Sequence, residues 1–126
     1  MMQSFAISAN LAGLLKRRGW LAFGFSLDGL KRVWQEEAFR VEAVLAAVLV
    51  PVAMMLHLSP LEKVALIGVL LLVLVIETLN TAVEVAIDHI SYERHPLAKQ
   101  AKDLASAAVL LTLILALLTW VVLLWF

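Results

Sequence analysis

The chain has 126 residues, no cysteine, and ten basic residues against ten acidic ones, so its formal net charge is zero. Hydrophobic residues make up 63% of it, whereas a soluble domain holds roughly 45–50% and a small one cannot bury such an excess. These values exclude disulfides and thiolate metal sites, give no support for nucleic-acid binding, and indicate a membrane protein of one domain.

The N-terminal region, residues 1–40, holds six of the ten basic residues, including the cluster Lys16-Arg17-Arg18. Its apolar residues recur at spacings compatible with a helical face, which predicts an amphipathic helix at the membrane interface, lying on an anionic leaflet. Glycines lower the helix propensity, and a break is expected near Gly24-Phe25-Ser26. A flexible, solvated arm is the alternative. The uncharged start is not typical of a signal peptide.

The first transmembrane helix is predicted over residues 41–58, where only Glu42 and His57 interrupt the apolar sequence. Eighteen residues give ~27 Å of helix, which just spans a hydrocarbon core of ~30 Å. Pro51 is expected to bend this helix, as membrane bundles tolerate.

The second span is predicted over residues 61–90, and its start has a clear signal. Ser59 can cap the helix, Pro60 suits the first helical position, and Glu62 completes an S-x-x-E capping box. The third span, residues 103–126, has no charge after its first residue. Basic residues concentrate in the N-terminal region and in the second connection, which predicts that both lie in the cytoplasm and that the C-terminus lies outside.

Polar residues of the second span share one helical stripe, Glu77, Asn80, Thr81, Glu84 and Asp88. Polar residues of the other spans fall at the same predicted level, Glu42, Lys102, Asp103 and Ser106. An ionisable side chain near the bilayer centre costs ~3 kcal/mol or more unless it is paired or solvated. Asn80, Thr81 and Ser106 could serve only to hydrogen-bond neighbouring helices. The acids, with Glu36-Glu37 nearby, suggest a magnesium site that includes phosphate oxygens.

Three blocks of this sequence resemble motifs of the bacterial integral-membrane diacylglycerol kinases. The run Glu77-Thr78-Leu79-Asn80-Thr81-Ala82-Val83-Glu84, followed by Asp88, resembles the signature E-x-x-N-[ST]-A-x-E-x-x-x-D. The stretch from Ala101 to Val109 resembles A-K-D-x-x-[SG]-A-A-V, and the segment from Glu36 to Glu42 resembles E-x-x-F-R-x-E. The blocks occur in the family's order, and the resemblance runs from about Leu14 to the C-terminus.

The resemblance implies an all-α homotrimer in the bacterial inner membrane, with three spans and an interfacial N-terminal helix in each subunit. It implies transfer of the ATP γ-phosphate to diacylglycerol, with Mg²⁺ and without a P-loop. Glu77 would be the general base, and Glu84 with Glu36 (or Glu37, depending on where one residue is missing from the spacing) would hold Mg²⁺. By the same resemblance, the nucleotide would contact Glu93, His95, Lys102, Asp103 and Asp88. The lipid substrate would contact Glu42, Asn80, Ser106 and Arg40.

Two alternatives remain at this stage. The sister branch of the family phosphorylates undecaprenol, and the F-R-x-E form of the motif in this chain favours the diacylglycerol branch. A small proton-coupled transporter, with Glu77 as its proton carrier, is the alternative from another class. It would need neither ATP nor the Lys102-Asp103 pair.

Overall fold

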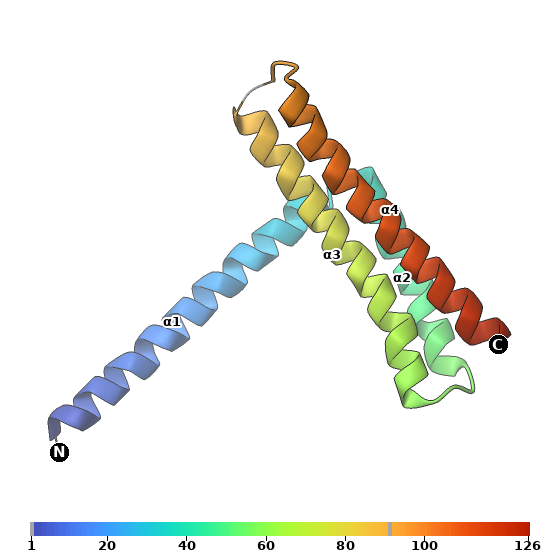
Figure 1. The fold of residues 1–126 in the computed structure, drawn as a ribbon. Coiled ribbons are helices and arrows are strands. Elements are labelled where there is room, and N and C mark those ends of the chain that lie inside the picture. The colour runs from blue at the N-terminus through green and yellow to red at the C-terminus, as the bar shows by residue number, and fades with distance from the viewer. Residues whose placement is uncertain (1, 91) are drawn as a thin grey trace. The chain divides into compact units, whose positions relative to one another are not determined.

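A computed structural model describes residues 2–90 and 92–126, and these residues form four helices and no strand. The helices are α1 (Met2–Val33), α2 (Glu37–Met55), α3 (Pro60–Ile90) and α4 (Pro96–Trp125) (Figure 1). The predicted all-α architecture is therefore confirmed. The chain divides into two compact units, residues 1–33 with α1 and residues 34–126 with the other three helices.

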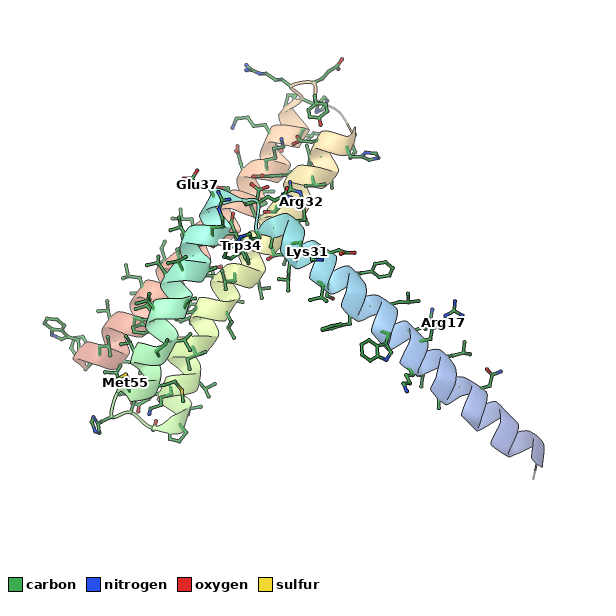
Figure 2. All side chains as sticks on the ribbon, turned by 180° about the vertical axis from the view of Figure 1, so that it is seen from behind. Arg17, Lys31, Arg32, Trp34, Glu37 and Met55 are labelled. Atoms are coloured by element: carbon green, nitrogen blue, oxygen red, sulfur yellow. The ribbon has the colours of Figure 1, made fainter. Side chains whose placement is uncertain are left out.

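The first unit is one long helix. α1 runs through Gly24-Phe25-Ser26 without interruption, so the predicted break is wrong, and helix replaces the alternative of a flexible arm. A glycine costs ~1 kcal/mol against alanine within a helix but keeps both backbone hydrogen-bonding groups. The Ser26 hydroxyl donates to the Ala22 carbonyl at 3.0 Å, inside the same turn. Side chains project along α1, among them Arg17 and Lys31 (Figure 2). Its placement at a membrane interface stays a prediction.

The second unit holds three helices that are long and apolar enough to cross a membrane, α2, α3 and α4. The chain is therefore an integral membrane protein. α3 follows the predicted second span closely. α2 begins at Glu37 and α4 at Pro96, both ahead of the spans expected from hydropathy. Helical backbone continues into polar sequence at these two ends, because a hydropathy pattern marks only the part of a helix that suits lipid.

The predicted capping box at the start of α3 is confirmed. The backbone N–H of Glu62 donates to the Ser59 hydroxyl at 3.3 Å, and the Glu62 carboxylate accepts from the Ser59 N–H at 2.7 Å. The Lys63 ammonium donates to the Met54 carbonyl at 2.8 Å, near the end of α2. These contacts satisfy backbone groups that helix ends leave without a partner, and they fix the short connection between α2 and α3.

α3 packs against both α2 and α4, most extensively against α4 (Figure 1). Leu66 of α3 is fully buried, and the buried residues of the neighbouring helices include Ala53 of α2 and Ala116 of α4. Small side chains let helix backbones approach closely. The Trp120 indole N–H donates to the Leu66 carbonyl at 3.3 Å and joins α4 to α3. Most large apolar side chains of α2 and α4 remain exposed, as lipid-facing surfaces require.

Candidate functional site

The centre of the polar stripe on α3 is buried. Glu77 is 6% exposed and Thr81, one turn further along, is 5% exposed. Glu42 of α2 lies within electrostatic range of Glu77, and its Oε2 atom is buried with no hydrogen-bond partner among the described residues. Two carboxylates from two helices therefore share one buried polar region.

This polar region continues along α3 toward α4. The Asn80 amide nitrogen lies 3.5 Å from the Glu84 carboxylate, and the Asn80 side chain also hydrogen-bonds Glu77. Glu84 in turn interacts electrostatically with both Glu77 and Lys102 of α4. We refer to Glu42, Glu77, Asn80 and Glu84 as the carboxylate layer. Of the α4 residues predicted to meet at this level, Lys102 interacts with Glu84, whereas Asp103 pairs with Lys99, so the predicted convergence is present only in part.

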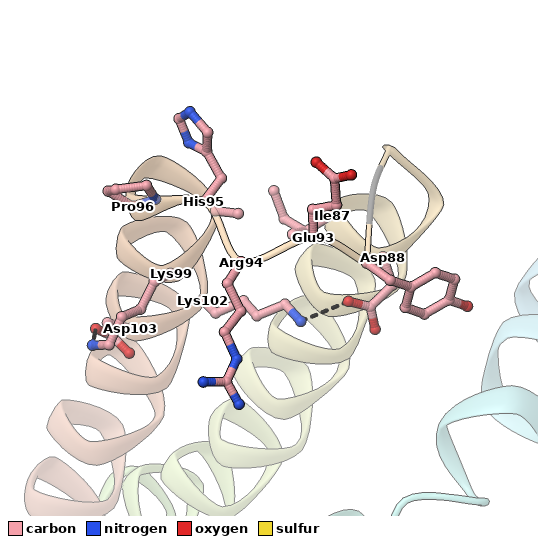
Figure 3. Close-up of a pocket in the computed structure, with 11 residues that line it drawn as sticks. Ile87, Asp88, Glu93, Arg94, His95, Pro96, Lys99, Lys102 and Asp103 are labelled. Atoms are coloured by element: carbon pink, nitrogen blue, oxygen red, sulfur yellow. Dashed lines mark hydrogen bonds and ion pairs between the residues drawn. The ribbon is translucent and has the colours of Figure 1, made fainter.

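One ion pair connects the start of α4 to the end of α3, and a second lies within α4. The Lys102 ammonium lies 2.6 Å from the Asp88 carboxylate, which connects the two helices across the connecting loop (Figure 3). Lys99 and Asp103 form a second pair at 2.6 Å, one turn apart on α4. The side chains of the Lys102–Asp88 pair are 39% and 40% exposed, so this pair remains accessible to a ligand.

A pocket of about 610 Å³ opens between these helix ends and the loop that joins them (Figure 3). Its volume falls in the range of small-molecule sites, roughly 300–1,000 Å³. Its lining includes all five residues for which the resemblance implies nucleotide contact, Asp88, Glu93, His95, Lys102 and Asp103. His95 has a structural role as well, because its Nδ1 atom accepts from the Leu97 N–H at 3.2 Å and caps α4.

Two predicted lipid-binding residues lie outside the carboxylate layer in this structure. Arg40 of α2 and Ser106 of α4 are both exposed. Within the described residues, neither side chain forms an ion pair or a hydrogen bond with the carboxylate layer. Their predicted contact with lipid stays untested.

Comparison with known proteins identifies the family. A family model described as prokaryotic diacylglycerol kinase matches residues 24–124. The chain belongs to this family. Diacylglycerol kinase of Escherichia coli K12 is 43% identical over 105 residues, which cover 82% of this chain and 86% of the relative. The Pseudomonas aeruginosa protein is 45% identical over 100 residues, covering 79% and 81%. The Helicobacter pylori protein is 41% identical over 120 residues, covering 94% and 92%.

The family match contains every candidate site residue, since these lie between Glu36 and Ser106. The predicted recognition of a lipid kinase family, and with it of an enzyme, is confirmed. The similarity to the Helicobacter pylori diacylglycerol kinase covers 94% of the chain, so it reaches most of the N-terminal helix, beyond the start of the family model.

The resemblance implies a Mg²⁺ ion that accompanies ATP, and acidic side chains would be its protein ligands. In residues 2–90 and 92–126, no three acidic or histidine side chains meet as a metal-binding group. Mg²⁺ commonly binds one or two protein carboxylates and completes its coordination with phosphate oxygens and water. Besides Glu42, the carboxylates of Glu84 and Glu36 lie within electrostatic range of Glu77, whereas Glu37 is exposed at the start of α2. Glu84 and Glu36 are carboxylates of the kind that can hold Mg²⁺ together with phosphate oxygens, and the choice between Glu36 and Glu37 stays a prediction.

Several pocket residues escaped the sequence analysis. Tyr92, Arg94 and Lys99 line the pocket beside the predicted nucleotide residues. No spacing rule singles them out, because they lie in the loop and in the first turn of α4. Their position between Asp88 and Lys102 in the sequence is the only signal that could have found them.

Proposed function

We propose that this protein transfers the γ-phosphate of ATP to diacylglycerol and so forms phosphatidic acid and ADP. The observation that carries the proposal is a buried carboxylate, Glu77, that lies next to further acids on the helix whose end lines a pocket of basic and acidic side chains. Membership of the diacylglycerol kinase family supports the same reaction. The relatives reported above are named as kinases, so the transporter alternative has lost its support.

Glu77 is the proposed general base. Its carboxylate accepts the proton of the lipid hydroxyl, the lipid oxygen forms a bond to the γ-phosphorus, and the bond from that phosphorus to the β-phosphate oxygen of ATP breaks. Burial suits this role, because a base that meets a lipid headgroup must work where water is scarce. Asn80 holds Glu77 and Glu84 in place through hydrogen bonds.

ATP is proposed to bind in the pocket at the end of α3 and α4. Lys102 and Asp103 would position the nucleotide, with Asp88, Glu93 and His95 around it. Asp88 lies 11 positions after Glu77 in the sequence, which corresponds to roughly 16 Å along a helix. The adenosine part would therefore occupy the pocket, and the phosphates would extend along α3 toward Glu84.

Mg²⁺ would be held by Glu84 and Glu36, with Glu37 as the alternative to Glu36. When bound with ATP, the ion offsets negative charge on the phosphates in the transition state. The lipid headgroup would be contacted by Glu42, Asn80, Ser106 and Arg40. Glu42 supports this assignment with a buried carboxylate oxygen that has no partner in the described residues.

We further propose a homotrimer in the bacterial inner membrane, with the pocket on the cytoplasmic side. The charge distribution of the connections supports this orientation. Glu84 and Lys102 are only partly buried in one chain although they belong to helices that can span a membrane. An ionisable side chain on a membrane-spanning helix has to be shielded from lipid by other protein surfaces, and neighbouring copies of this chain would supply them.

The proposal is tested by incubating the detergent-solubilised protein with γ-labelled ATP, Mg²⁺ and either diacylglycerol or undecaprenol in mixed micelles. Labelled phosphatidic acid is the expected product. Label on undecaprenol alone would keep the phosphoryl-transfer mechanism and replace the lipid. Label on neither lipid, without ATP binding, would contradict the proposed function.

A further inference from the structure

The chain has four threonines, all on α3 and α4, and one of them differs from the others in its hydrogen bonding. The hydroxyls of Thr78, Thr112 and Thr119 donate to the backbone carbonyl four residues earlier, at 2.8, 2.7 and 2.8 Å. A threonine inside a helix commonly uses its hydroxyl in this way. The Thr81 hydroxyl forms no hydrogen bond within residues 2–90 and 92–126, so its donor is unused there.

Thr81 lies on the same buried face of α3 as Glu77. Only 5% of Thr81 is exposed. It follows Glu77 by four residues and precedes Glu84 by three, and residues at these separations are neighbours on a helix surface. Two fully enclosed side-chain atoms of the described residues lack a partner, Glu42 Oε2 and Asn80 Oδ1, and the Thr81 oxygen is not one of them. The Thr81 oxygen therefore stays accessible to a ligand that binds beside Glu77.

The carboxylate layer around Thr81 is rich in acceptors and poor in donors. Its three glutamates only accept hydrogen bonds when they are ionised. The Asn80 amide nitrogen lies 3.5 Å from the Glu84 carboxylate, and the Asn80 side chain also hydrogen-bonds Glu77. A phosphoryl group that enters this region brings more acceptor oxygens and has to be met by donors. Thr81 supplies a donor that no other residue of the described chain uses.

We propose that Thr81 is a further catalytic residue, whose hydroxyl donates to an oxygen of the γ-phosphoryl group during its transfer from ATP to the lipid. This role rests on the proposed function, in which the γ-phosphate lies between the base Glu77 and the Mg²⁺ ligand Glu84. A donor aimed at the transferring group stabilises the charge on its oxygens in the transition state. An ester carbonyl of diacylglycerol is an acceptor as well. The phosphoryl oxygen is favoured because it is charged and accepts the stronger hydrogen bond.

The test compares the full-length wild type with Thr81→Val, Thr81→Ser and Thr112→Val in the labelled-ATP assay with diacylglycerol. Valine keeps the branched shape of threonine and removes the donor. Thr112 is the matched control, because it is also buried, at 8% exposed, but its hydroxyl is used by the Ala108 carbonyl. Thr81→Val should lower kcat about 10–100-fold, as expected for a hydrogen bond to a charged group, with an unchanged KM for diacylglycerol. Thr81→Ser should keep most of the wild-type kcat, and Thr112→Val should keep all of it.

Thermal unfolding of the ligand-free protein in detergent separates a ligand contact from a structural one. Thr81→Val should unfold at the wild-type temperature or above it, because the hydroxyl that it removes has no partner in the described chain. A lower unfolding temperature would show that the hydroxyl holds the structure together, for example by bonding to another copy of the chain, and would overturn the inference.

The kinetic outcomes separate the inference from the proposed function. An unchanged kcat for Thr81→Val would overturn the inference and leave the proposed function intact. A raised KM for diacylglycerol at an unchanged kcat would assign Thr81 to the lipid and likewise overturn it. Absence of labelled phosphatidic acid from the wild type would overturn the proposed function itself.

Discussion

The Lys102 ammonium of α4 lies 2.6 Å from the Asp88 carboxylate of α3 and connects the two helices at the pocket. The two side chains are 39% and 40% exposed, so water still reaches them. Ion pairs with this much exposure contribute little to stability, because their Coulomb attraction is weakened by solvent and offset by lost side-chain entropy. The pair is therefore better suited to organising the pocket than to holding the helices together.

Replacing either member of this pair should affect nucleotide use more than stability. For Lys102→Met and Asp88→Asn we expect a higher KM for ATP, because each change removes a charged group that lines the pocket. Thermal unfolding in detergent should change little. Steady-state kinetics at varied ATP and saturating diacylglycerol, together with unfolding curves, check both parts. A large drop in the unfolding temperature at an unchanged KM would show that the pair is structural.

The assignment of the metal ligands predicts a difference between two adjacent acids. Glu36 lies within electrostatic range of Glu77, whereas Glu37 is exposed at the first position of α2. Glu36→Gln and Glu84→Gln should therefore raise the free Mg²⁺ concentration needed for half-maximal activity. Loss of one carboxylate ligand weakens a site that has few protein donors.

Glu37→Gln is the matched control and should need the same Mg²⁺ concentration as wild type. Activity is measured against free Mg²⁺ at a constant concentration of ATP. If Glu37→Gln raised the required Mg²⁺ concentration and Glu36→Gln did not, Glu37 would be the metal ligand in place of Glu36.

The capping box at the start of α3 should contribute to stability and not to catalysis. Ser59→Ala removes the hydroxyl that accepts the Glu62 N–H at 3.3 Å, and loss of such a cap costs about 1 kcal/mol. We expect a lower unfolding temperature and an unchanged KM for ATP and for lipid. Ser59→Thr, which keeps a hydroxyl, should restore most of the stability. An unchanged unfolding temperature for Ser59→Ala would mean that this end of α3 frays in the native protein.

The parts of the fold that could be predicted from the sequence depend on local patterns. The start of α3 was predictable because Ser59, Pro60 and Glu62 interact within one helical turn. The polar stripe around Glu77 was predictable for a similar reason, since helical periodicity alone places those residues on one face.

Contacts between helices were harder to predict. The partner of Lys102 is Asp88, 14 residues away across the connecting loop, and no periodic pattern relates the two. Arg94 was missed because the position of a loop side chain depends on how both helix ends are held. A local pattern also led to a wrong prediction, the break near Gly24. α1 continues through this residue, because one residue with low helix propensity does not by itself end a long helix.

The central claim, that Glu77 is the base of a lipid kinase, is tested most directly by Glu77→Gln in the labelled-ATP assay with diacylglycerol. The substitution keeps the size of the side chain and one accepting oxygen but removes the group that accepts the proton. We predict wild-type stability and ATP binding, with formation of labelled phosphatidic acid reduced about 10²–10⁴-fold. Formation of labelled phosphatidic acid by Glu77→Gln at a rate near that of wild type would contradict the account.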